Sequence, residues 1–346
     1  MSLIDFIRDM PKVELHVHLE GSIQPETLLQ LARRNNVRLP VDTMPALRQW
    51  YTFSDFGRFL EIYRVISACI CTPDDIELIA REFIRGQAEQ NVRYSEVIYT
   101  PYTHFESDRS IPFPDQLAAL GRAREWGVSE LDTPVGWVLD ISRDVRPVEH
   151  SLLVADWAIR GIECGVVGFG IGGPEAGNPP GLFRAAFDRT RAAGLASLPH
   201  AGEIAGPESM WGALELLHAD RIGHGVRCLE DPSLVALLRE RQLPLDVSPS
   251  SNVCLGVATG LAEHPLPRLL SEGLYVTINS DDPPMFNTTL TDEYLRIASA
   301  FGFGAELIEG LVLNGVRATS LPPGDRMAME EYFREEFARL RTGSQM

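Results

Sequence analysis

Eight short apolar segments, each followed by residues with helical periodicity, recur along this chain and constrain its fold more than any other feature. They are KVELHVHL (12–19), VRYSEVIYT (92–100), VGWVLDIS (135–142), VVGFGI (166–171), LASLPHA (195–201), DRIGHG (220–225), LPLDVS (243–248) and LYVTINS (274–280). The later segments recur at intervals of roughly 20 to 30 residues, which suits one strand and one helix of a parallel sheet. Eight such units in 346 residues predict an α/β fold, a (βα)8 TIM barrel, formed by residues 1–346 as a single domain.

The interval between the first two segments is longer than the others and contains YTFSDFGRFLEIYRVISACI (51–70). Its apolar side chains either pack an additional helix onto the barrel or cover a pocket. An insertion after the first strand lies at the carboxyl-end mouth of a barrel, where active sites are found. We therefore expect a helical lid over about residues 45–90, in which Phe56 and Leu60 contact the substrate, and further helices after the last strand.

The overall charge and the cysteine pattern exclude several classes of protein. The net charge of −17 and the absence of a basic run disfavour binding to nucleic acid or to an anionic membrane surface. Five cysteines without a C-x-x-C pair argue against a disulfide framework and against a cysteine zinc site. The N-terminus does not resemble a signal peptide, and no apolar run reaches the roughly 18 residues of a membrane span. We expect a cytoplasmic protein whose partner is a small molecule, and the sequence leaves a homo-oligomer open.

Side chains that can bind a metal ion accompany four of the predicted strands. They are His16 and His18 in the first strand, His200 and Glu203 at the end of the fifth, His224 at the end of the sixth, and Asp281 and Asp282 after the eighth. His16 and His18 project to the same side because side chains alternate along a strand. The carboxyl ends of parallel barrel strands converge at one mouth, so we expect these side chains to meet. Histidines with a carboxylate suit one zinc ion per chain, and Fe²⁺ or Mn²⁺ is accepted by the same ligands.

The other four histidines do not follow a predicted strand in this way. His218 lies within helical periodicity and His264 precedes a proline, so both are expected to be structural or to face solvent. His104 and His150 receive no role from the sequence.

Four motifs, HVHLEGS, PHAGE, RIGHG and NSDDPP, occur in this order and resemble those of the adenosine deaminase family of the amidohydrolase superfamily. The resemblance extends from the first predicted strand to the eighth and therefore covers nearly the whole chain. It implies a barrel that holds one zinc or similar divalent cation. Carried over by motif, the metal ligands would be His16, His18, His200 and Asp281.

The resemblance also implies a role for the remaining polar residues. Glu203 would donate a proton to the purine ring, which requires that it be protonated beforehand. His224 would be the base near the attacking water, and Asp282 would hold that water in place. The segment VVGFGIGGPE (166–175) matches the substrate loop of the family, in which Gly173 would donate its backbone N–H to the purine. The implied reaction is hydrolytic deamination of a 6-aminopurine to the 6-oxopurine and ammonia.

Three features depart from adenosine deaminases of the animal type and bear on the substrate. Glu20 stands where that type has a shorter aspartate that touches the ribose; it either caps the turn or, as we expect from its place at the mouth, contacts the substrate. Pro174 in the substrate loop cannot donate a backbone hydrogen bond. SPSSN (248–252) is similar to bacterial members that act on adenine or aminodeoxyfutalosine. We expect adenosine or a related nucleoside as substrate, then aminodeoxyfutalosine of menaquinone synthesis, then adenine.

Two other classes of function are compatible with the same residues. Another metal-dependent hydrolase could use this barrel, but its binuclear members commonly need a bridging modified lysine. The one lysine, Lys12, lies too early in the chain for that role. An inactive ligand-binding homologue is expected to have lost its acid or its base, whereas Glu203, His224 and Asp282 are all present.

Overall fold

The computed structural model describes residues 2–53 and 55–342, in which nine strands form two parallel sheets. The first sheet has the order β1-β2-β3-β4-β5 and the second has the order β6-β7-β8-β9. The strands are β1 (Lys12–His18), β2 (Val92–Tyr99), β3 (Val135–Ser142), β4 (Val166–Gly172), β5 (Ala196–Ser197), β6 (His200–Ala201), β7 (Ile222–His224), β8 (Leu245–Val247) and β9 (Val276–Ile278). Their near-continuous burial explains the apolar runs of the sequence, because a barrel strand is covered on both faces.

Backbone hydrogen bonds join the two sheets at both of their edges. β5 and β6 come from one predicted strand, which is interrupted at Pro199 because proline has no N–H. The Pro199 carbonyl nevertheless accepts from Gly223 N, at 3.0 Å. At the other edge, His18 N donates to the Asp281 carbonyl at 2.9 Å, and Asp281 N donates to the His16 carbonyl at 3.2 Å. Eight strand segments therefore form a hydrogen-bonded ring, and the predicted (βα)8 barrel is confirmed.

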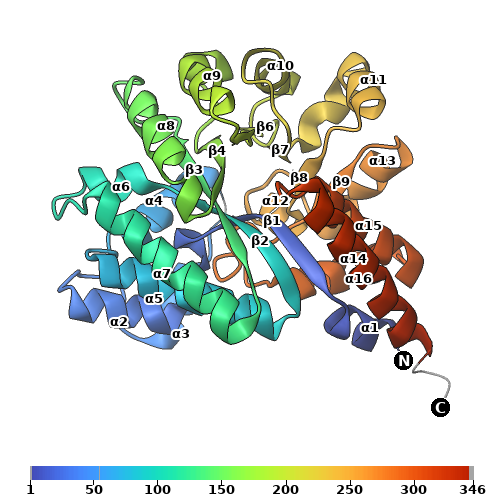
Figure 1. The fold of residues 1–346 in the computed structure, drawn as a ribbon, viewed down its shortest axis with the longest axis horizontal. Helices are drawn as coiled ribbons and strands as arrows, with labels where there is room; N and C mark the ends of the chain where they lie inside the picture. The colour runs from blue at the N-terminus through green and yellow to red at the C-terminus, as the bar shows by residue number, and fades with distance from the viewer. Residues whose placement is uncertain (1, 54, 343–346) are drawn as a thin grey trace.

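Helices surround the strands, as Figure 1 shows. The apolar core lies between the strands and these helices. The helices that follow successive strands are α5 (Pro73–Glu89), α7 (Phe113–Leu131), α8 (His150–Arg160), α9 (Arg184–Ala192), α10 (Pro207–Leu216), α11 (Pro232–Arg241), α13 (Leu266–Ser271) and α15 (Ala305–Ala318). Shorter or additional helices are α1 (Leu3–Asp9), α2 (Pro25–Arg34), α6 (Pro101–Glu106), α12 (Pro249–Cys254), α14 (Leu290–Phe301) and α16 (Pro323–Thr342). No helix in the described part of the chain combines the length and the apolarity needed to cross a bilayer.

The helices within the expected insertion differ in their positions. α3 (Met44–Trp50) and α4 (Phe56–Ser67) precede α5, and α5 packs against α7 and β2 as part of the outer ring. α4 instead lies over the barrel mouth, where the rings of Phe59 and Phe286 stack with centroids 5.7 Å apart. Phe286 follows the NSDDPP motif, so this contact ties α4 to the segment that ends the eighth strand. The part of the insertion that covers the site is thus α4.

Candidate active site

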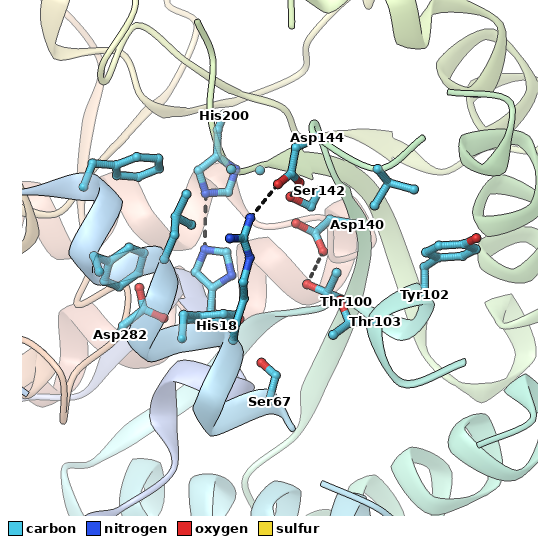
Figure 2. Close-up of a pocket in the computed structure, with 18 of the residues that line it drawn as sticks. His18, Ser67, Thr100, Tyr102, Thr103, Asp140, Ser142, Asp144, His200 and Asp282 are labelled. Carbon is cyan, nitrogen blue, oxygen red and sulfur yellow. Dashed lines mark hydrogen bonds and ion pairs between the residues drawn. The ribbon is translucent and has the colours of Figure 1, made fainter. Parts of the chain in front are cut away.

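The four metal-binding side chains implied by the motifs lie together at the strand ends. His18 Nε2 is 3.2 Å from His200 Nε2 and 3.4 Å from Asp281 Oδ1. His16 Nε2 is 3.5 Å from the same oxygen of Asp281. Figure 2 shows His18 and His200 pointing toward each other, with Asp282 beside them. The convergence of parallel strand ends, which the sequence analysis assumed, produces this cluster.

The donor atoms of the cluster fit a divalent cation. His200 Nδ1 lies 2.9 Å from the Ile171 carbonyl, so it carries the ring proton and leaves the lone pair on Nε2. His16 Nε2 is buried and makes no hydrogen bond within the described ranges. Burial lowers the pKa of His18 to about 4 and the pKa of His200 well below its usual value, so both rings are neutral near pH 7. Neutral imidazoles with a carboxylate form a zinc-type ligand set. The ligand atoms of His16, His200, His224 and Asp281 lie within 4.8 Å of one another, and those of His18, Asp281 and Asp282 form a second group of this kind. The motifs imply that His16, His18, His200 and Asp281 would hold the ion.

Local backbone features at this cluster explain two of the motifs. Asp281 and His224 have left-handed conformations, with φ of 66° and 64°, which side chains with a Cβ seldom adopt. Such conformations persist where the surrounding structure holds them, often at functional sites. A Cβ at Gly223 would lie only 2.6 Å from Cε1 of His16. The RIGHG motif therefore supplies both His224 and the space that the His16 ring occupies.

The ring of His224 is supported from behind by Asn252 and His264. Asn252 Nδ2 is 3.4 Å from His224 Nδ1, and Asn252 Oδ1 is 3.1 Å from His264 Nε2. Leu266 N donates to His264 Nδ1 at 3.0 Å, so the proton of a neutral His264 ring lies on Nε2 and is donated to Asn252. His264 is buried and structural, and His218 is exposed, as expected. The support by Asn252 was not predicted, although the residue belongs to the SPSSN segment.

Glu203 lies on the cavity side of the metal cluster and has the properties of an acid. Its Oε1 is 3.7 Å from His224 Nε2 and is buried without a hydrogen-bond partner in the described chain. Burial, and then the charges of Asp281 and Glu175, raise the pKa of Glu203 well above its usual value. This environment favours the protonated form of Glu203, which can donate a proton to a bound ring nitrogen.

Glu175 holds the loop that carries Glu203, a role that the sequence analysis missed. Its Oε1 accepts from the backbone nitrogens of Glu203, Ile204 and Ala205 at 3.0, 2.9 and 3.2 Å. Its Oε2 accepts from Gly202 N at 3.0 Å and from the hydroxyl of Ser209. The available signal was the GGPE sequence in the substrate loop, whose glutamate received no role. A single carboxylate thus satisfies four successive N–H groups of the PHAGE loop.

Replacing Glu175 by alanine is expected to lower kcat/KM on the order of 10²-fold, because Glu203 loses its fixed position. The free energy of unfolding should fall by about 3 kcal/mol, since buried hydrogen bonds to a charged group are lost. Kinetics and urea denaturation measure the two effects, and metal content should not change. The control is Glu163→Ala, which removes an exposed glutamate. Unchanged kcat/KM in Glu175→Ala would contradict the assigned position.

Asp282 shares a tight space with Gly21 of the HVHLEGS motif. Gly21 lies in the short 3-10 turn η1 (Glu20–Ser22), which directly follows β1 and Leu19. A Cβ on Gly21 would lie only 1.6 Å from Asp282 Oδ1. That oxygen is buried and has no hydrogen-bond partner among the described residues. Burial and the neighbouring Asp281 raise the pKa of Asp282 well above its usual value, as suits a group that takes up a proton.

Gly21→Ala is expected to displace the Asp282 carboxyl and to lower kcat/KM on the order of 10²-fold. Asp282 is not one of the four implied ligands, so the bound metal per chain should stay the same. Steady-state kinetics and metal analysis test this result. Gly121→Ala is the matched control, because a Cβ at that helical position meets nothing within 4 Å. Equal activity in the two variants would show that Asp282 can move without consequence.

A cavity of about 370 Å³ opens beside the cluster. Phe56 and Leu60 of α4 and Gly173 of the substrate loop line it, and their contact with a substrate stays a prediction. The residues of the cluster that reach it are His18, His200, Glu203, His224, Asp281 and Asp282. The cavity is large enough for a purine ring with a further substituent.

Glu20 is placed behind the wall of the cavity. Its side chain is 1% exposed, and its Oε1 accepts from Thr100 N at 3.0 Å and lies 3.1 Å from His104 Nε2. Tyr63 donates to Oε2 at 3.4 Å. All three partners belong to the protein, and Glu20 is not among the residues that line the cavity. Contact between Glu20 and a substrate therefore stays a prediction, and His104, which follows β2, is a supporting residue that the sequence did not identify.

Comparison with known proteins places this geometry in context. The profile of the family described as adenosine deaminase matches residues 11–335. An aminodeoxyfutalosine deaminase of Streptomyces coelicolor is 40% identical over 94% of this chain and 84% of its own length. The corresponding enzyme of Streptomyces avermitilis is 41% identical over 92% of this chain and 89% of its own length. An adenine deaminase of Crocosphaera subtropica is 35% identical over 92% of this chain and 97% of its own length.

Solved structures show the same architecture. The crystal structure of an adenine deaminase from Arthrobacter aurescens has a TM-score of 0.89 and 31% identity, over 96% of this chain and 99% of that one. An amidohydrolase from Burkholderia ambifaria with bound zinc has a TM-score of 0.90 and 26% identity, over 98% of this chain and 94% of that one. The motifs, the barrel and these matches lead to one conclusion: the chain belongs to the adenosine deaminase family of hydrolytic deaminases.

Proposed function

We propose that this protein is a zinc-dependent deaminase of a 6-aminopurine nucleoside, with aminodeoxyfutalosine as the first candidate substrate. The observation that carries the reaction is a buried Glu203 carboxyl, whose environment raises its pKa well above the usual value, beside a His and Asp cluster that fits a cation. The choice of substrate rests on relatives named aminodeoxyfutalosine deaminase, which share 40% and 41% identity with this chain. The sequence analysis placed adenosine first and aminodeoxyfutalosine second. These relatives reverse that order and favour aminodeoxyfutalosine.

The proton transfers follow from the positions of three residues. A zinc ion held by His16, His18, His200 and Asp281 would lower the pKa of a water molecule towards neutrality. Asp282 accepts one proton of the attacking water and passes it to the leaving amino group. Glu203 protonates N1 of the purine as the water oxygen bonds to C6, and the second water proton restores Glu203. This assignment exchanges the two roles expected from the sequence, in which His224 was the base and Asp282 held the water. Burial lowers the pKa of His224 to about 3, so we propose that it stays neutral and orients the water. The products are the 6-oxopurine and ammonia.

Free adenine is the second candidate. Relatives and a solved structure named adenine deaminase match this chain at 35% and 31% identity. The cavity extends beyond the space that a purine base needs, which favours the nucleoside.

Ammonia release from zinc-loaded protein tests the proposal. Aminodeoxyfutalosine, adenosine and adenine are compared at equal concentration, with Glu203→Gln as the control. We expect turnover of aminodeoxyfutalosine with a higher kcat/KM than the other two, and no comparable turnover by the control. If none of the three purines released ammonia, the proposed deamination would be wrong. If adenine were the preferred substrate, the proposed nucleoside substrate would be wrong.

A further inference from the structure

The cavity has a polar end formed by side chains that do not belong to the metal cluster. Figure 2 shows Asp140, Thr100, Thr103 and Tyr102 on one side of the view, with His18, His200 and Asp282 on the other. These residues come from the carboxyl ends of β2 and β3 and from α6. Neither the metal cluster nor the acid at N1 uses them. The polar end therefore faces the part of the substrate that does not react.

Asp140 is the buried carboxyl of this polar end. The residue is 3% exposed, and its Oδ1 accepts from the hydroxyl of Thr100 at 2.6 Å. Its Oδ2 receives no hydrogen bond within residues 2–53 and 55–342. Gly172 lies alongside, where a Cβ would come within 3.1 Å of Oδ2. The neighbouring backbone thus leaves this oxygen open to the cavity.

Placing a carboxyl where it is largely shielded from water costs free energy. Oδ2 of Asp140 faces the cavity, where it can be hydrated in the empty site and can accept from a substrate group when the site is filled. Burial raises the pKa of Asp140 to about 7, which reflects the same cost. An apolar side chain would avoid this cost, so stability does not account for the carboxyl. A donor from the substrate would.

Thr100 fixes the position of Asp140 before any substrate arrives. Its hydroxyl binds Asp140, and its backbone nitrogen binds Glu20 Oε1 at 3.0 Å. His104 lies against the same oxygen of Glu20. The ends of β1, β2 and β3 are thereby tied together, and the acceptor does not have to be ordered on binding.

The charges around the polar end argue against a phosphate as the partner. Arg64 is already paired with Asp144, at 2.7 Å, and Glu106 also lines this side of the cavity. Among the described residues that line this end, a phosphate would meet carboxylates and no unpaired arginine, whereas an uncharged hydroxyl can donate to Asp140.

We propose that Asp140 is a specificity-determining residue whose Oδ2 accepts a hydrogen bond from a sugar hydroxyl, so that the site selects a purine nucleoside over the free base. This inference rests on the proposed function. A free base carries no hydroxyl and leaves the buried acceptor unpaired. Sites built around such an acceptor reject the analogue that lacks the donor.

The test compares wild type with Asp140→Ala and with the isosteric Asp140→Asn. For adenosine, kcat/KM should fall about 10- to 100-fold in Asp140→Ala, mainly through KM, with a smaller loss in Asp140→Asn. Activity on adenine should stay within about twofold, because adenine never used the bond. In wild type, either 2′-deoxyadenosine or 3′-deoxyadenosine should show the same loss, and Asp140→Ala should abolish that difference. The control Asp156→Ala removes a surface carboxylate of α8 that pairs with Arg189.

Binding of inosine and hypoxanthine to the zinc-loaded proteins gives a readout that needs no turnover. Asp140→Ala should weaken the binding of inosine and leave the binding of hypoxanthine unchanged. Parallel losses for inosine and hypoxanthine, or no loss for either, would overturn the role of Asp140 even in an active deaminase. Failure of the proposed function has a different signature, since wild type would then release no ammonia from any purine.

Discussion

Glu203→Gln is expected to lower kcat for every 6-aminopurine that the protein deaminates, on the order of 10² to 10⁴-fold. Glutamine keeps the size of the side chain but cannot supply the acid proton to N1. The loop should stay in place, because Glu175 binds its backbone nitrogens and not the side chain of residue 203. KM and metal content should therefore change little. Steady-state kinetics with metal analysis measure this result, and a variant within tenfold of wild type would rule out Glu203 as the acid.

The pH profile gives a second measurement on the same residue. The pKa of Glu203 is raised well above its usual value, so the protonated form persists to a higher pH than in an exposed glutamate and is lost as the pH rises through the raised pKa. Because the protonated form is the active one, kcat/KM should decline tenfold per pH unit on the alkaline side. The residual activity of Glu203→Gln should lack this decline. An alkaline limb that persists in the variant would assign it to another group.

Removal of metal is expected to abolish ammonia release, and addition of one equivalent of zinc per chain should restore it. The cluster brings Nε2 of His18 within 3.2 Å of Nε2 of His200, and the Nε2 atoms of His16 and His18 within 3.5 and 3.4 Å of Asp281 Oδ1, a geometry that a bound cation would stabilise. Burial opposes ionisation of Asp281, but the surrounding histidines hold its pKa well below its usual value, so its charge is available at neutral pH. The midpoint of thermal unfolding should rise with zinc, because the ion binds the folded chain.

Dialysis against a chelator, followed by metal analysis and assay, checks this expectation. His200→Ala should bind zinc weakly and should not recover activity, whereas His218→Ala changes an exposed histidine outside the cluster and should behave as wild type. Full turnover by metal-free protein would overturn the metal-dependent reaction. Restoration by Fe²⁺ or Mn²⁺ in addition to zinc would show that the ligand set does not select one metal.

The spacing of apolar segments was enough to predict the barrel and the meeting of its polar strand ends. Alternation along β1 places His16 and His18 on one side, and the parallel arrangement brings them to His200 and Asp281. These inferences succeed because strand periodicity and strand order are properties of the local sequence. Residues 45–90 show the limit: the sequence predicts helices there, but it does not predict that, among the described residues of this range, α4 lines the cavity while α5 packs in the outer ring.

The partners of the buried polar groups could be read only from the tertiary structure. Glu175 binds the loop of Glu203 from a different strand end, Asn252 supports His224, and Glu20 turns to Thr100 and His104 behind the cavity wall. Each of these contacts depends on the register of neighbouring strands and on the path of the loops, which bring together residues far apart in sequence. Local sequence shows that a side chain is polar and buried; the packing of the barrel decides which donor it meets, and at Asp140 it leaves one oxygen open to the cavity.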